Sequence, residues 1–236
     1  MPDFACRSPA LEWLETAAPA RGERAAYLRS LARLNGAMLG HRPVLNWLGE
    51  VAGRPPRGEP LTLLDVGCGY GDLLRAARRW ANRRGVALRL IGIDIEPDTV
   101  AIARDTTAAG DEIEYLVADV FNLRPSFHID VVVSSLVAHH LGDERVVALL
   151  RWMETTARRG WMIADLERHP VPYHAIGIAG PLLGVHPMVI GDGRISVTRA
   201  LTRAEWRPKV EAAGIAPDAV RLDRFLYRLS VSRLKA

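Results

Sequence analysis

The stretch LLDVGCGYGDLL, residues 63–74, decides the fold of this chain. An aliphatic run ends at glycines 67, 69 and 71, and apolar residues at helical spacing follow. This order predicts a buried strand, a tight turn and a helix. A dinucleotide-binding loop has the spacing G-x-G-x-x-G, and a phosphate-binding P-loop ends in Lys-Ser or Lys-Thr; neither is present here. A pyrophosphate is therefore not the expected ligand.

Short aliphatic runs continue to alternate with amphipathic stretches after this motif, which is typical of a mostly parallel sheet covered by helices. Helical spacing recurs near residues 73–80, 100–107, 146–153 and 202–213. A final pair of strands is expected in 220–234, with the last strand reversed. The other expected strands are 61–67, 87–95, 113–119, 129–135 and 160–166.

Two segments stand outside this alternation. Residues 1–60 have helical periodicity and are expected to form an N-terminal helical cap, ended by the proline- and glycine-rich GRPPRGEP at 53–60. Residues 167–200 contain four prolines with glycines and aromatic residues, and are expected to be a lid inserted over one end of the sheet. Cap, lid and the region 61–236 are expected to form one domain.

Composition limits the class of protein. The chain has 236 residues, about half of them hydrophobic, and a net charge of +4 without long basic runs, so nucleic acid is not an expected partner. Cys6 and Cys68 are the only cysteines, which suits a reducing compartment, with Cys6 in a frayed terminus. No leader and no long apolar run is present. We expect a cytoplasmic protein without membrane insertion.

Three acidic residues complete the glycine motif. Asp65, Asp94 and Asp119 each end one of the first three expected strands. The carboxyl ends of parallel strands meet at one rim, so these carboxylates should lie close together. An acid after the second strand suits ribose hydroxyls, and one after the third can reach an adenine amino group. The expected ligand is a nucleoside with an uncharged or cationic remainder.

The segments 63–74, 91–104, 114–123 and 127–141 resemble, in order and spacing, the cofactor motifs of class I S-adenosylmethionine-dependent methyltransferases. The small-molecule branch, which includes quinone-biosynthesis and polyketide-pathway enzymes, is the most similar. The resemblance implies a Rossmann-like, seven-stranded α/β sheet that binds S-adenosylmethionine (SAM) and releases S-adenosylhomocysteine. Cofactor-binding residues implied by it are Asp65, Gly67, Cys68, Gly69, Asp94, Ile95, Asp119, Val120 and Ser134.

Several of these residues have a structural alternative. Gly71 either approaches the ligand or allows close packing of helix and strand. Asp119 either meets adenine or caps a turn. Cys68 is expected to be a small packing residue, because nothing near it activates a thiolate. Arg29, Arg33 and His41 of the cap are candidate partners for the cofactor carboxylate.

Methyl transfer to oxygen calls for a base, and histidine suits this role near neutral pH. His139 follows the fourth expected strand, and Asp165, which ends the fifth, could orient it. We predict a His139 base supported by Asp165, with His140 as the alternative base; Glu167 and His169 are weaker candidates. The pair His139 and His140 could instead form a helix start with one exposed ring. No metal is expected, because no metal-binding motif is present.

The acceptor is expected to be a small, hydrophobic aromatic molecule, because the cap and lid are rich in apolar residues. Methylation at a phenolic oxygen, as in secondary metabolism, is the preferred interpretation, and carbon methylation of a quinol or phenol ring is the alternative. A nucleic-acid methyltransferase is less favoured, because SSLV at 134–137 differs from the Asn/Asp-Pro-Pro-aromatic motif of base-methylating enzymes. A noncatalytic SAM-binding protein is the remaining rival.

Overall fold

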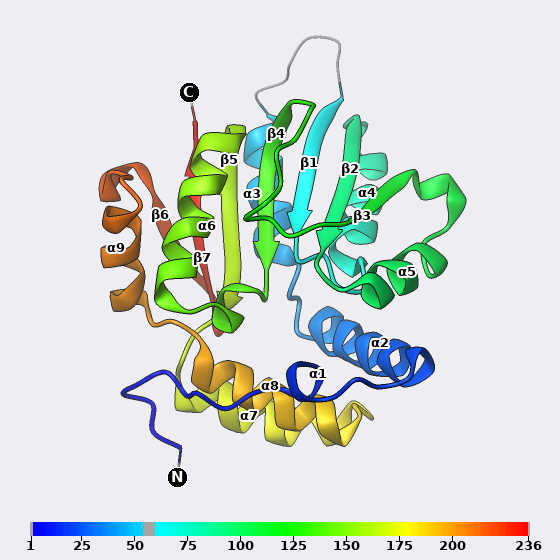
Figure 1. Ribbon diagram of the computed structural model, residues 1–236, viewed down its shortest axis with the longest axis vertical. Coiled ribbons are helices and arrows are strands. Elements are labelled where there is room, and N and C mark those ends of the chain that lie inside the picture. Colours follow the sequence, from blue (N-terminus) through cyan, green and yellow to red (C-terminus); the bar gives the residue numbers. More distant parts are fainter. Residues whose placement is uncertain (1, 54–59, 236) are drawn as a thin grey trace.

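The computed structural model describes residues 2–53 and 60–235. Most of the break expected at 53–60 lies outside the described residues. The described chain forms a seven-stranded sheet in the order β3-β2-β1-β4-β5-β7-β6 (Figure 1). The first five strands run parallel, and β7 is antiparallel to both neighbours, as predicted. The strands are β1 (Leu61–Val66), β2 (Leu88–Asp94), β3 (Ile113–Val117), β4 (Ile129–Ser135), β5 (Ala157–Leu166), β6 (Arg221–Phe225) and β7 (Arg228–Leu234).

Helices cover both faces of the sheet, which explains why all six residues of β1 are buried. One face packs against α3 (Arg42–Ala52), α4 (Asp72–Arg84) and α5 (Pro97–Asp105), and the other against α6 (Asp143–Thr156) and α9 (Arg203–Ala212). Trp47 of α3 is buried in the first of these layers. Helix α3 therefore belongs to the sheet layers, and not to the cap in which the sequence placed it.

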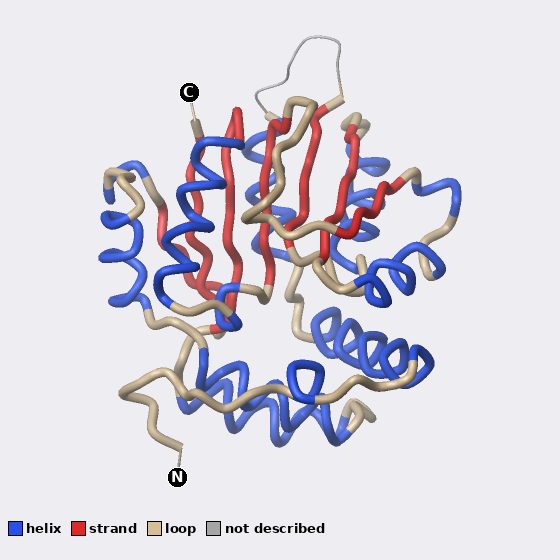
Figure 2. Tube along the Cα trace, in the orientation of Figure 1, coloured by secondary structure: helices blue, strands red, loops and turns tan. Residues whose placement is uncertain are grey.

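The remaining α-helices lie beyond the carboxyl ends of the parallel strands (Figures 1 and 2). They are α1 (Trp13–Thr16), α2 (Arg21–Ala37), α7 (Pro170–Leu182) and α8 (Pro187–Arg199). Tyr27 and Leu28 of α2 pack with Val189 of α8 in one apolar cluster, so cap and lid form one layer. Short 3-10 turns occur at Ala109–Asp111, Ala138–His140 and Pro217–Ala219.

The lid is helical although it holds four prolines. Pro170 and Pro187 occupy the first turns of α7 and α8, where a missing N–H costs no hydrogen bond. The side chains of His169 and His186 cap these helices by accepting bonds from Val171 N and Met188 N. Within the described residues, no helix is long and apolar enough to cross a membrane.

Candidate active site

The glycine loop joins β1 to α4, and its three glycines have different surroundings. Gly67, Gly69 and Gly71 have φ values of +71°, +51° and +75°, a region that favours glycine. A Cβ on Gly67 would lie 2.4 Å from Val137, and one on Gly71 would lie 2.3 Å from the hydroxyl of Tyr115. A Cβ on Gly69 would meet no atom within 4 Å. Gly71 thus serves close packing, and Gly69 faces open space.

Asp94 ties this loop to β2. Its Oδ2 accepts a hydrogen bond from Gly69 N at 3.0 Å, and its Oδ1 accepts one from Glu96 N at 3.0 Å. Burial raises the pKa of the Asp94 carboxyl, although these backbone donors partly oppose the rise. Ile95, the next residue, is 68% exposed, which is unusual for a large aliphatic side chain beside a sheet. Asp94 thus contacts the loop at Gly69, and the residue after it presents an exposed apolar side chain.

Asp65 ends β1 beneath the loop. The residue is buried, and its Oδ1 has no hydrogen-bond partner among the described residues. Burial, together with the charges of Asp72 and Asp94, raises the pKa of the Asp65 carboxyl well above its usual range. An unpartnered, buried carboxyl oxygen beside a ligand loop is suited to a cationic donor such as an ammonium group.

The third strand-end acid makes local contacts. Asp119 Oδ1 accepts from Phe121 N at 3.0 Å, and Oδ2 accepts from the amide of Asn122 at 3.1 Å. This is the capped turn that was the structural alternative. Each carboxylate oxygen keeps a second lone pair, so the adenine contact stays a prediction. Val120 packs in the core below this turn.

Two predicted cofactor residues turn into the protein. Ser134 is fully buried in β4, and its hydroxyl donates to the carbonyl of Val66 at 3.1 Å. Its side chain holds β4 to β1, so the prediction that it binds the cofactor is corrected for that side chain. Cys68 is buried against Gly92, and burial raises the pKa of its thiol, in agreement with a packing role.

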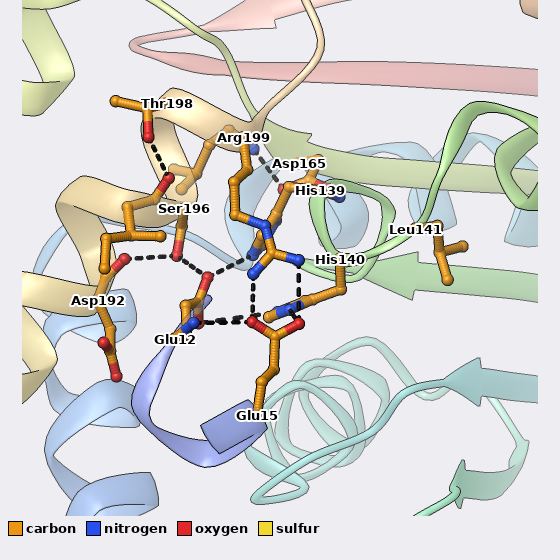
Figure 3. A network of polar contacts seen from close by, with 12 residues as sticks. Glu12, Glu15, His139, His140, Leu141, Asp165, Asp192, Ser196, Thr198 and Arg199 are labelled. Atoms are coloured by element: carbon orange, nitrogen blue, oxygen red, sulfur yellow. Dashed lines mark hydrogen bonds and ion pairs between the residues drawn. The ribbon is translucent and has the colours of Figure 1, made fainter. Parts of the chain in front are cut away.

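His139 lies in the 3-10 turn that follows β4 and is buried at the carboxyl ends of the strands (Figure 3). Its backbone N–H donates to Asp165 Oδ2 at 2.9 Å, and Asp165 Oδ1 lies 2.7 Å from its Nδ1. Its Nε2 faces Glu12 Oε1 at 3.5 Å. The predicted proximity of His139 and Asp165 is present, whereas Glu12 was not expected from the sequence.

Two carboxylates therefore flank one buried imidazole. Burial disfavours its charged form, but the charges and hydrogen bonds of Asp165 and Glu12 outweigh burial and raise the pKa of His139 to about 9. Conversely, and against their own burial, the pKa values of Asp165 and Glu12 are lowered by His139. At neutral pH the imidazole is a cation held between two anions.

The N-terminal segment is anchored and does not fray, contrary to expectation. The guanidinium of Arg7 donates to the carbonyls of His139 and Leu141 at 3.1 and 2.9 Å. Ser196 of α8 donates to Glu12 Oε1 at 2.7 Å. These contacts place Glu12 next to His139, which is 127 positions away, and no local sequence signal announces such a pairing.

His140 lies beside His139, with ring centroids 4.2 Å apart, but its nitrogens face glutamates and not Asp165. Its Nδ1 lies 3.3 Å from Glu15 Oε1, and Glu15 also accepts from the guanidinium of Arg199. Burial and the charge of His139 lower the pKa of His140, against the opposing effect of the two glutamates. One ring is thus buried and its neighbour is partly exposed, as the structural alternative for this pair described.

The weaker base candidates take no part in the cluster. The carboxylate of Glu167 pairs with Arg224 on β6. His169 caps α7 through Val171 N at 3.2 Å. Each side chain therefore has a structural partner away from His139.

A metal ion is chemically compatible with the cluster. Ligand atoms of Glu12, His139 and His140 lie within 4.8 Å of one another. A carboxylate on the second nitrogen of a ligating histidine, as Asp165 is here, is also common in metal sites. The prediction of a metal-free site therefore needs an experiment.

A cavity of about 60 Å³ lies between the strand ends and the cap. Its wall includes His139 and Glu12, apolar side chains such as Leu34 of α2 and Ile176 of α7, and Arg228 from the start of β7. The cap and lid thus enclose the predicted place of the acceptor, with a wall that is more polar than expected. Arg29 and Arg33 are exposed instead.

Residues 63–160 match a family model described as a methyltransferase domain. This stretch is therefore similar to a methyltransferase domain. Over 89 residues, 37% of this chain, it is 34% identical to the non-reducing polyketide synthase esdpA of Penicillium shearii, and it spans only 4% of that relative.

Two solved methyltransferase structures show the same Rossmann-like class I fold as this chain. Human N-acetylserotonin methyltransferase in complex with SAM has a TM-score of 0.66 and 17% identity, covering 97% of this chain and 60% of that one. The CMeT domain of the citrinin polyketide synthase has a TM-score of 0.60 and 13% identity, covering 82% and 52%. At these identities the likeness establishes the fold.

Proposed function

We propose that this chain is a SAM-dependent methyltransferase that acts on a phenolic oxygen of a small aromatic acceptor. The observation that carries the proposal is the buried dyad of His139 and Asp165, in which His139 lines a cavity at the carboxyl ends of the strands. The similarity of residues 63–160 to a methyltransferase domain and the polyketide-pathway relatives support the choice of reaction class.

The loop and its acids fit the cofactor. SAM supplies an electrophilic methyl group on a sulfonium. The free oxygen of Asp65 suits its ammonium group, Asp94 suits its ribose hydroxyls, and exposed Ile95 offers an apolar surface to adenine. The open space at Gly69 leaves room for the methionine portion. These residues bind and orient SAM, and the proton is transferred by the dyad of His139 and Asp165.

His139 is the proposed base. Its imidazole accepts a proton only after Nε2 has lost its own to solvent, because the pKa of about 9 keeps it cationic at neutral pH. An acceptor hydroxyl that donates to Nε2 displaces Glu12 and removes one of two carboxylates that stabilise the cation. The pKa of His139 then falls toward the range of an effective base, while Asp165 holds the ring in position.

The test is methyl transfer from labelled SAM to a panel of phenols, resorcinols and hydroxybenzoates. His139→Ala is expected to lower turnover by about 100-fold or more, with unchanged SAM affinity. For the free enzyme, kcat/KM should rise with pH toward about 9, and Glu12→Gln should shift that rise to lower pH. Near-normal turnover of His139→Ala would remove this residue from the mechanism.

Carbon methylation is the second candidate, because loss of the phenolic proton also activates the ring carbons. The likeness to the CMeT domain of the citrinin synthase supports keeping it. Nuclear magnetic resonance of the product separates the two outcomes, since an O-methyl and a ring C-methyl group have distinct chemical shifts.

A further inference from the structure

Arg228, the first residue of β7, has an unsatisfied guanidinium. It lies opposite Leu166 at the carboxyl end of β5, is only 4% exposed, and borders the cavity. In the described structure the guanidinium makes one hydrogen bond, from Nη2 to Asn35 Oδ1 of α2 at 3.0 Å, and its Nε has no partner. No described carboxylate forms an ion pair with it; Asp165 and Asp72 act on it only as more distant charges.

A second buried arginine shows what a structural role looks like in this fold. Arg168 is also 4% exposed, and its guanidinium donates to the carbonyls of Phe4, Ala5 and Ala200 and to the carboxylate of Glu205. Burial of a charged group is costly unless it is paired and hydrogen-bonded. Arg168 meets that condition, whereas Arg228 lacks an anionic partner.

The backbone around Arg228 makes room for this arrangement. A Cβ on Gly40, in the connection between α2 and α3, would lie 2.8 Å from Nη2, so a larger residue would displace the guanidinium or the connection. The neighbouring cavity wall is apolar, with Met38, Leu136 and Leu166. The wall also holds the cation of His139, which is flanked by Asp165 and Glu12, whereas the guanidinium of Arg228 has no described carboxylate paired with it.

The carboxylates elsewhere in the cavity do not compete with an incoming anion for this site, because each has its own partners. Glu12 contacts His139 and Ser196, and Asp192 accepts from the hydroxyl of Tyr27 at 2.6 Å.

We propose that Arg228 binds a carboxylate of the acceptor, so that the substrate is a phenolic acid with its hydroxyl directed at His139. This rests on the proposed function. A guanidinium is suited to carboxylates because its planar N–H groups can donate two parallel bonds. The cavity of about 60 Å³ is smaller than usual ligand pockets of about 300–1,000 Å³, so acceptor entry requires the helices over it to move apart.

The main variant is Asn35→Asp. It replaces the amide that accepts the hydrogen bond of Arg228 Nη2 by a carboxylate in the same position. It should retain the fold and raise the melting temperature, because it pairs the buried cation. Arg228→Met and Arg33→Met are measured beside it. Arg33 is an exposed arginine of α2, the helix that carries Asn35, and serves as the matched charge control. Circular dichroism checks that each variant is folded.

The measurement is calorimetric binding of 2,4-dihydroxybenzoate and resorcinol to the protein saturated with S-adenosylhomocysteine. Wild type and Arg33→Met should prefer the carboxylate-bearing probe by about 10- to 100-fold, and Asn35→Asp should abolish that preference. Equal affinities in wild type, or a preference that survives in Asn35→Asp, would overturn the proposal.

Cofactor titration separates the remaining explanations. If Asn35→Asp or Arg228→Met weakens S-adenosylhomocysteine binding and leaves acceptor preference unchanged, the guanidinium serves the cofactor carboxylate and the proposal is wrong. If wild type fails to bind S-adenosylhomocysteine, the proposed function fails first, and probe binding without cofactor then tests Arg228 on its own.

Discussion

The cation held between Asp165 and Glu12 makes protein stability depend on pH in a defined window. A histidine whose pKa rises from 6.5 in the unfolded chain to about 9 in the folded one stabilises the fold most below pH 6.5. The contribution is lost as pH increases through 9. At about 1.4 kcal/mol per pKa unit, the shift corresponds to about 3 kcal/mol.

The perturbation is the double variant His139→Gln/Asp165→Asn, which replaces the charged dyad by a neutral pair. Urea unfolding of wild type and variant between pH 6 and 9.5 gives the free energy of unfolding of each. The wild-type advantage should shrink by about 3 kcal/mol across this range. Asp165 is ionised throughout it, because its pKa is lowered, so the change reports on His139.

His140→Gln is the matched control. The pKa of His140 is lowered from 6.5, so its titration in both the folded and the unfolded chain is complete above about pH 7.5, and its loss should leave the fall in stability between there and pH 9.5 in place. A wild-type advantage that is constant from pH 6 to 9.5, or that grows with pH, would refute the picture of a cation between two carboxylates.

Three further predictions concern the ligand loop and the metal. Gly69→Ala should fold, at a cost of about 1 kcal/mol for its positive φ, but lose SAM affinity, because its Cβ would occupy the open space proposed for the methionine portion. Gly71→Ala should instead lower the melting temperature strongly, because its Cβ would lie 2.3 Å from the hydroxyl of Tyr115. Asp94→Asn should weaken SAM binding about tenfold by calorimetry, and unchanged affinity would exclude the carboxylate as a ligand. EDTA should leave turnover unchanged, because His139 is already partnered on both sides; loss restored by one added divalent ion would contradict this.

The parts of this protein that sequence reasoning found are those encoded locally. A strand, a glycine turn and a helix follow one another at 61–84, and their order specifies a parallel sheet. The carboxyl ends of neighbouring parallel strands share one rim, which placed Asp65 and Asp94 on either side of the glycine loop; the adenine contact of Asp119 stays a prediction. The same geometry brought His139 to Asp165 across two adjacent strands.

The corrections have a common physical cause. Ser134 lies one residue before the end of the fourth strand, but side chains alternate between faces and its hydroxyl donates to the carbonyl of Val66. The three glycines share a backbone region, and only the packing of Val137 and Tyr115 distinguishes Gly67 and Gly71 from Gly69. Spacing does not reveal which neighbour fills the place of a missing Cβ.

By itself, the sequence determined the fold class, the alternation of strands and helices along the chain, and the proximity of His139 and Asp165, because hydrophobic period and strand ends are short-range information. Only the tertiary structure decided that the carboxylate of Glu12 faces His139 Nε2 and that the buried guanidinium of Arg228 donates to Asn35. These contacts join residues 127 and 193 positions apart, and their polar groups interact only once the chain has folded and excluded water between them.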